Sequence, residues 1–76
     1  MRIISQNGTY NFPFEGIYLG LDANDMSKIN AYSASNGVFL KTVAIYTNPN
    51  QARQILEELT ENKTKIYQFP PDENLG

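Results

Sequence analysis

The chain has 76 residues, of which 41% are hydrophobic, so we expect one small globular domain. It contains no Cys, His or Trp, which excludes a thiolate nucleophile, a disulfide, a His general base and a Cys/His metal site. Six Lys and Arg against eight Asp and Glu give a net charge of −2, and without a basic cluster a general duplex-binding surface is disfavoured.

The opening segment has the clearest local pattern. Asn7-Gly8 is a preferred pair for a type I′ turn, because both central residues of that turn have positive φ. A turn at this point sets Ile3 opposite Phe12 in two antiparallel strands. Pro13 lacks an N–H group, so we expect the second strand of this hairpin to lie at a sheet edge.

Three more strand-like segments follow, separated by residues typical of turns. Residues 17–21 have the alternating side-chain pattern of a strand, and every second residue from Ile17 is predicted to point inward. Residues 28–33 predict a weaker strand. Residues 38–46 are rich in β-branched and aromatic types and are long enough to predict the central strand of the sheet.

The segment after Tyr46 has the pattern of an amphipathic helix. Asn48 is a good N-cap, and Pro49 occupies the first helical position, where a backbone N–H is not needed. We expect the helix to end near Asn62, in the left-handed conformation. Apolar residues recur at spacings of three and four and form one stripe: Ala52, Ile55, Leu56 and Leu59.

Residues 65–69 predict a last short strand, which the two following prolines end. The order of elements favours an α+β fold. We expect one antiparallel sheet of about five to six strands, with the N-terminal hairpin first and the amphipathic helix packed on one face, in two layers. A single domain is predicted over residues 1–71, followed by a flexible C-terminal tail over residues 72–76.

One acidic segment has a partial resemblance to a calcium loop. Asp-Ala-Asn-Asp at residues 22–25 begins like an EF-hand, but Met26, Ser27 and Ser33 stand where that pattern has an oxygen ligand, Gly and Glu. We interpret the segment as an Asx-type turn between strands, and we predict no metal site.

Paired carboxylates are the remaining source of acid–base chemistry. None of them stands in a distinctive sequence context, and the helix glutamates fit a solvated face, so we predict no catalytic or cofactor-binding residue and no cofactor. The candidates considered are Glu15, Asp22, Asp25, Glu57, Glu58 and Glu61.

Five Tyr and four Phe lie mostly on predicted strands. A single helical stripe covers only one face of a sheet, so some rings are expected on an exposed face. They allow three interpretations: core and cross-strand packing, stacking of single-stranded bases, or contact with a protein partner. The candidate interaction surface consists of Tyr18, Tyr32, Phe39, Lys41 and Tyr67.

Two blocks at the ends of the chain resemble a set of small proteins encoded by phages and prophages of Firmicutes. The opening M-R-I-I-S-Q-N-G-T with F-P-F-E at residues 12–15 is similar to their M-R-[IV]-I-S-Q-[DN]-G-x, then Pro, an aromatic residue and Glu. Y-Q-F-P-P-D-E at residues 67–73 is similar to their ending. The resemblance does not extend to the segment between residues 17 and 47. It implies a bacterial cytoplasm and a phage-related role, with no functional residues to carry over.

We therefore predict a small non-enzymatic accessory protein of phage or prophage type that acts by protein–protein contact, one version being a modulator of a host protein. The alternative is a single-stranded nucleic-acid-binding module that uses sheet aromatics. The expected partner is a host or phage protein, or a second copy in a homodimer, with nucleic acid less favoured. No segment has the apolar length of a membrane span or a signal peptide, so we expect a cytoplasmic protein without a membrane partner.

Overall fold

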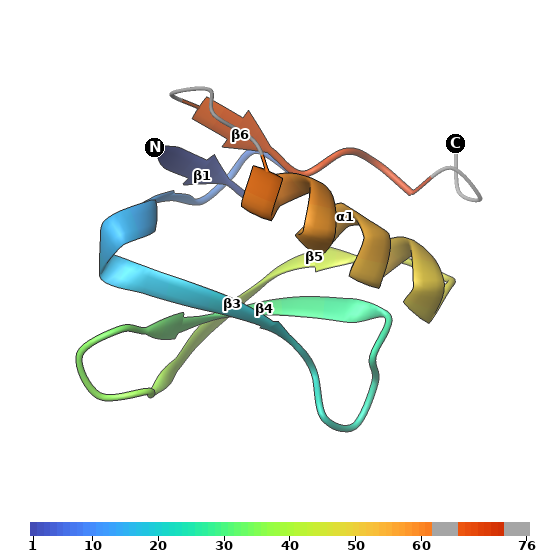
Figure 1. Cartoon of the computed structure of the whole chain (residues 1–76), viewed down its shortest axis with the longest axis horizontal. Coiled ribbons are helices and arrows are strands. Elements are labelled where there is room, and N and C mark those ends of the chain that lie inside the picture. Colours follow the sequence, from blue (N-terminus) through green and yellow to red (C-terminus); the bar gives the residue numbers. More distant parts are fainter. Residues whose placement is uncertain (62–65, 73–76) are drawn as a thin grey trace.

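A computed structural model describes residues 1–61 and 66–72 of the chain (Figure 1). The described residues form an α+β fold with one α-helix, a short 3-10 helix and two three-stranded sheets. The elements in chain order are β1 Arg2–Ile4, β2 Asn11–Pro13, η1 Phe14–Gly16, β3 Ile17–Leu21, β4 Lys28–Ser33, β5 Phe39–Ile45, α1 Pro49–Glu61 and β6 Ile66–Gln68.

The first sheet has the strand order β2-β1-β6. β1 pairs with β2 antiparallel and sets Ile3 opposite Phe12, and Pro13 lies on the edge strand β2, as its missing N–H predicts. On the other side β1 pairs with β6 in parallel, so that Ile3 also lies opposite Tyr67. The expectation of one antiparallel sheet is therefore wrong, because the ends of the chain meet in parallel and form a sheet of their own.

The turn in the opening segment is not of type I′. Among the described residues only Gly8 and Gly37 have positive φ, so Asn7 does not adopt the conformation that this turn requires. Instead, the Asn7 side chain accepts a hydrogen bond from the Thr9 N–H at 3.0 Å, and the Gly8 N–H donates to the Ser5 carbonyl at 2.9 Å. The Asn7 side chain thus stabilises a longer connection between β1 and β2.

The second sheet is antiparallel, with the order β3-β4-β5. β4 is its central strand, so the prediction that residues 38–46 supply the central strand is wrong. β5 is interrupted by two register shifts against β4, between Ile29 and Asn30 and between Ala31 and Tyr32. On the side of β5 away from β4, the Gln6 N–H donates a hydrogen bond to the Val43 carbonyl at 2.7 Å.

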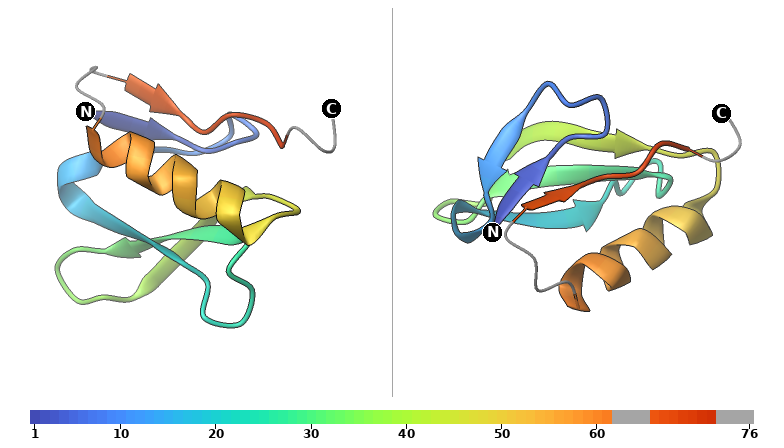
Figure 2. Two further views of the ribbon diagram at one scale, coloured as in Figure 1. Left: turned by 45° about the vertical axis from the view of Figure 1, so that its right-hand side comes forward. Right: turned by 90° about the horizontal axis from the view of Figure 1, so that it is seen from above.

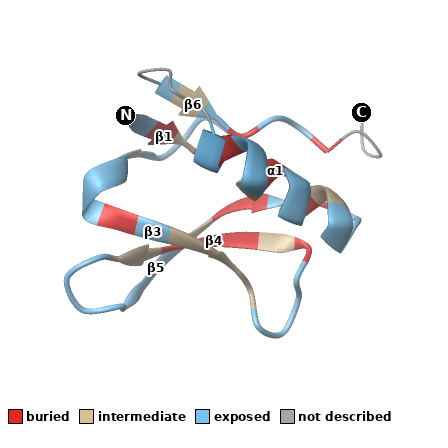
Figure 3. Cartoon of the chain, in the orientation of Figure 1, coloured by how far each residue is buried: buried red, intermediate tan, exposed pale blue. Residues whose placement is uncertain are grey.

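The core lies between the two sheets and the helix. Seen from above, β1 and β6 lie over the second sheet, and α1 runs along one side (Figure 2). The buried hydrophobic side chains come from β1, β3, β4, β5, α1 and the segments that follow β5 and β6, and buried positions are red in Figure 3. The largest fully buried side chains are Phe69, Ile3 and Ile29.

The helix begins as its sequence predicts. The Asn48 side chain accepts a hydrogen bond from the Asn50 N–H at 2.8 Å, and α1 starts at Pro49. Three positions of the apolar stripe are buried and the fourth, Leu56, is partly buried against the core. The expected end at Asn62 lies outside the described residues. α1 is not long and apolar enough to cross a membrane, and it is the one α-helix in the described residues.

The segment after β6 is tied firmly to the domain. Phe69 is buried, and the Pro70 carbonyl accepts a hydrogen bond from the Tyr46 hydroxyl at 2.7 Å. Asp72 is buried as well, and its carboxylate accepts a hydrogen bond from the Thr47 N–H at 2.7 Å. Asp72, which the sequence placed in a flexible tail, is therefore part of the folded domain. The rest of that predicted tail, residues 73–76, lies outside the described residues.

Candidate functional site

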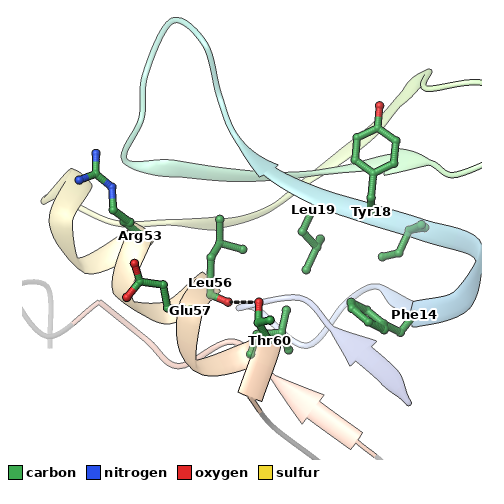
Figure 4. A pocket seen from close by; sticks show the side chains of 9 residues that line it. Phe14, Tyr18, Leu19, Arg53, Leu56, Glu57 and Thr60 are labelled. Atoms are coloured by element: carbon green, nitrogen blue, oxygen red, sulfur yellow. Dashed lines mark hydrogen bonds between the residues drawn. The ribbon is translucent and has the colours of Figure 1, made fainter.

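Three of the five candidate residues form one row across the second sheet. Tyr18 lies opposite Tyr32, and Tyr32 lies opposite Phe39. Their strand neighbours Ile17 and Ala31 are buried in the core, so the row lies on the outer face of the sheet. Figure 4 shows Tyr18 directed away from the helix, on the other side of β3 from its neighbour Leu19. We refer to Tyr18, Tyr32 and Phe39 as the aromatic row.

The rings of the aromatic row contact one another. The Tyr18 and Tyr32 rings are stacked, with centroids 5.3 Å apart and an interplanar angle of 20°. The Tyr32 and Phe39 rings meet edge to face at 6.0 Å. Such pairs contribute roughly 0.5–1.5 kcal/mol each beyond area burial. Even so, Tyr18 is 49% exposed and Phe39 is 52% exposed, so the rings form an ordered surface that is half open to solvent.

A buried amide beside the row fixes the central ring. Asn30 is 3% exposed, and its Nδ2 donates to the Tyr32 hydroxyl at 3.2 Å and to the Asp22 carboxylate at 3.1 Å. Its Oδ1 accepts a hydrogen bond from the Thr42 hydroxyl at 2.8 Å. The amide thereby links the β3–β4 turn, β4 and β5. The sequence analysis did not predict this network. Its only signal was a polar residue, Asn30, flanked by the apolar residues Ile29 and Ala31 on the predicted strand.

A glycine lies beside the same ring. Gly20 lies opposite Asn30, and a Cβ atom added there would be 3.7 Å from the Tyr32 ring. The ring therefore passes over the backbone of β3.

The other two candidate residues lie elsewhere. The Lys41 ammonium is 4.7 Å from the centroid of the Tyr10 ring, in a cation–π contact at the edge between the two sheets. Tyr67 belongs to β6, packs against the core and meets Phe69 edge to face at 5.5 Å. Burial raises the pKa of the Tyr67 hydroxyl. The structure thus brings together three of the five residues and separates Lys41 and Tyr67 from them.

This geometry does not favour stacking of nucleic-acid bases. A base needs an open ring face and a nearby cation, whereas Tyr18 and Tyr32 each have one ring face occupied by their stacked contact. Lys41, the candidate cation, contacts Tyr10 and lies opposite Ala31, whose side chain is on the core side of the sheet.

A groove of about 400 Å³ opens between α1 and β3, and the sequence reading did not predict it. Apolar side chains line it, with Arg53, Glu57 and Thr60 from the helix on its rim (Figure 4). Leu19 and Leu56 face each other across the groove and are only partly buried. The signal in the sequence was the width of the apolar stripe on the helix, because Leu56 lies at the side of that stripe and is left only partly buried.

The acidic candidates have structural partners. The Asp22 carboxylate accepts hydrogen bonds from the Asn24 and Asp25 N–H groups, which is the predicted Asx-type turn, and Asp25 accepts in turn from Ser27. The Asn30 amide and the Asn24 N–H lower the pKa of Asp22, and the Ser27 hydroxyl and N–H lower that of Asp25. Both groups stay ionised at neutral pH, which is unfavourable for a general acid.

Glu15 is held in a similar way. Its carboxylate accepts a hydrogen bond from the Met1 ammonium at 3.0 Å. Its own backbone N–H and this ammonium lower its pKa. Residues 1–61 and 66–72 contain no group of three or more acidic side chains close enough to hold a metal ion.

Comparisons of the chain with protein families, with curated proteins and with solved structures find no match.

Proposed function

We propose that this chain is a small non-enzymatic protein that binds a partner protein through the outer face of its second sheet. The observation that carries the proposal is the aromatic row, in which two large side chains remain half exposed on the face opposite the core. In a protein interface such rings supply contact area at low cost in side-chain entropy.

Preorganisation supports the proposal. The ring–ring contacts and the Asn30 amide hold Tyr32 before any partner arrives, so little side-chain freedom is lost on binding. The surface also combines apolar rings with polar groups, because the Tyr18 and Tyr32 hydroxyls accompany the apolar Phe39. Aromatic residues of this kind are enriched in protein interfaces.

The resemblance of the two terminal blocks favours a phage or prophage accessory role in a bacterial cytoplasm, with a host protein as the partner. The resemblance assigns no functional residue, so it supports the cellular location and the type of partner but not the position of the binding site. Base stacking on the same rings is the weaker proposal, because Tyr18 and Tyr32 already stack on each other and the candidate cation, Lys41, contacts Tyr10 instead.

Quantitative affinity capture from a Gram-positive bacterial lysate tests the proposal. The Phe39→Ser and Tyr18→Ser variants are expected to lose the retained protein that the unaltered chain captures. Truncating an interface aromatic residue costs about 2 kcal/mol or more at a hot spot, or roughly a thirtyfold loss of affinity.

Ile66→Ser is the matched control, because Ile66 is 59% exposed but lies on β6 in the other sheet. This variant is expected to retain the same protein as the unaltered chain. Equal retention by all the variants would contradict the proposal, and so would a nuclease-sensitive complex that contains only nucleic acid.

A further inference from the structure

The edges of the two sheets differ in how they are protected against pairing with another chain. Natural proteins protect edge strands by short length, Pro, charge, bulges or a covering segment. β2 is three residues long and contains Pro13, and β6 is also three residues long. Those two edges therefore offer little backbone for pairing.

β5 is protected in two ways. It carries the two register shifts against β4. Gln6 covers its C-terminal half, because its side-chain oxygen accepts a hydrogen bond from the Ile45 N–H at 3.0 Å and its Nε2 donates to the Ile45 carbonyl at 3.1 Å.

β3 has none of these protections. Its sequence Ile-Tyr-Leu-Gly-Leu carries no charge and no Pro, and its five residues pair with β4 in unbroken register. In the described part of the chain no strand lies on its other side. A long, uncharged and regular edge of this kind is a template for a further strand.

The register shows which backbone groups face outward. The Asp22 N–H donates to Lys28 and the Ala34 N–H donates to Gly16, so Tyr18 and Gly20 make the hydrogen-bonded pairs with β4. The N–H and C=O groups of Leu19 and Leu21 therefore point away from the sheet. The Ile17 N–H donates to the Phe14 carbonyl, which leaves the Ile17 carbonyl directed outward.

We propose that β3 pairs with β3 of a second copy of this chain, antiparallel about a twofold axis at Leu19. The pairing joins the second sheets of the two copies into one continuous sheet. It uses the backbone edge of the sheet, and of the aromatic row it involves Tyr18 but not Phe39, so it is a different contact from the partner binding proposed above.

The strand is complementary to itself in this register. Leu19 meets Leu19 of the second copy, and Leu21 donates to the outward carbonyl of Ile17. Tyr18 lies opposite Gly20 of the second copy, where an aromatic ring covers the bare backbone of an edge glycine. Within one chain the Tyr32 ring already makes this kind of contact with Gly20. The pairing thus continues the aromatic row from one copy to the next.

The core of one chain is also incomplete at this edge. Leu19, Leu21 and Leu56 pack against the core but are only partly buried, and Leu19 and Leu56 also line the open groove. In the paired form the inward side chains of the second β3 lie beside these residues and extend the apolar layer. The second copy therefore buries apolar surface that no segment of the described chain covers.

Charge does not oppose the pairing. The groove rim carries one cation and one anion, Arg53 and Glu57, so two identical rims bring no excess of one sign together. At the strand ends, Glu15 is paired with the Met1 ammonium, and Asp22 is turned toward the Asn30 amide. This edge therefore fits a second copy of the chain better than it fits a strand of another protein that carries a net charge.

Sedimentation equilibrium over about 5 µM to about 1 mM tests the proposal, a range that spans weak to moderate dimers. The mass is expected to rise with concentration toward that of two chains. A mass that stays at that of one chain up to the highest concentration would overturn the proposal. A mass that rises beyond two chains would also overturn it, because a twofold pair is closed.

A backbone variant made by total chemical synthesis tests the edge itself. N-methylation of Leu19 removes an outward N–H without changing a side chain, and the twofold axis doubles the effect. Two lost hydrogen bonds predict a dissociation constant raised at least about tenfold. Methylation of Asn11, whose N–H faces outward on β2, is the matched control and is expected to change the constant less than about twofold.

Equal weakening by both methylations, or no change with methylated Leu19, would contradict the proposed edge. Amide exchange of the unaltered chain gives a second readout that needs no variant. The Leu19 N–H is expected to exchange more slowly as concentration rises, whereas the Asn11 N–H keeps its rate. A Leu19 rate independent of concentration would contradict the pairing.

Discussion

The two faces of the second sheet are made of residues from the same three strands, yet they differ in burial. On the inner face Ile29 and Ala31 are fully buried beneath the first sheet and the helix. On the outer face Tyr18 and Phe39 are half exposed and are ordered mainly by contact with other rings. Because the two sets interleave along one backbone, substitutions on one face are expected to change stability and those on the other to change binding.

The largest effect is expected at the centre of the inner face. Ile29→Ala removes a side chain with no exposed surface and leaves a cavity, so the free energy of unfolding should fall by about 2–5 kcal/mol. Urea denaturation followed by circular dichroism measures this. Ile66→Ala, at an exposed position, is the control and should change it by less than about 0.5 kcal/mol. Similar losses at both positions would remove the distinction between buried and exposed faces.

The next largest effect is expected at the amide that connects the outer face to the fold. Asn30→Ala deprives Asp22, Tyr32 and Thr42 of a shared partner, so the free energy of unfolding should fall by about 1–3 kcal/mol. The Tyr32 ring should also lose order. The chemical shifts and relaxation of its ring protons report this change, and an unchanged ring would show that the aromatic row is fixed by ring contacts alone.

A buried tyrosine provides a test by pH. Burial, with smaller effects from Tyr67 and Asp72, raises the pKa of Tyr46, whose hydroxyl donates to Pro70. The folded state thus holds this proton more tightly than the unfolded chain, where the pKa is about 10. Its contribution to stability is complete below that pH and is lost as the pH rises above it.

Tyr46→Phe should lower the free energy of unfolding at pH 7 by about 1 kcal/mol, because one hydrogen bond is lost. Urea denaturation at several pH values above about 10 should then show a shallower decline for this variant than for the unaltered chain. The decline should not vanish, because burial also raises the pKa of Tyr67. Identical slopes would contradict the assignment to Tyr46.

The smallest effect on stability is expected on the outer face. Phe39→Ser removes one edge-to-face ring contact from a half-exposed side chain, so the free energy of unfolding should fall by at most about 1 kcal/mol. Thermal unfolding measures this. A loss as large as that of Ile29→Ala would mean that the outer face holds the fold, and the comparison of the two faces would fail.

Local patterns predicted most of the elements. β3 and β4 have the predicted bounds, because alternation and turn residues are readable along a short segment. Asn48 and Pro49 predicted the start of α1. The parallel pairing of β1 with β6 could not be predicted in this way, because it joins Ile3 to Tyr67 across almost the whole chain. No local signal specifies the partner of so short a strand.

The candidate surface was predicted in part for a related reason. Simple alternation puts Lys41 on the same face as Phe39, two residues earlier. The register shift between them places Phe39 opposite Tyr32 but Lys41 opposite Ala31, so Lys41 leaves the sheet on the core side. Tyr67 was assigned to the same surface because the sequence predicted one sheet, whereas its strand belongs to the other. The Asn30 network depends on three segments and could be recognised only once they were brought together.

Site-specific photo-crosslinking in a Gram-positive bacterial cytoplasm tests the central claim most directly. A benzophenone-bearing phenylalanine analogue replaces Phe39 on the aromatic row or, as the control, Ile66 on β6. The proposal predicts a discrete protein adduct, larger than two copies of the chain, from position 39 and not from position 66. The same adducts from both positions, or adducts with nucleic acid alone, would contradict the claim that the outer face binds a protein.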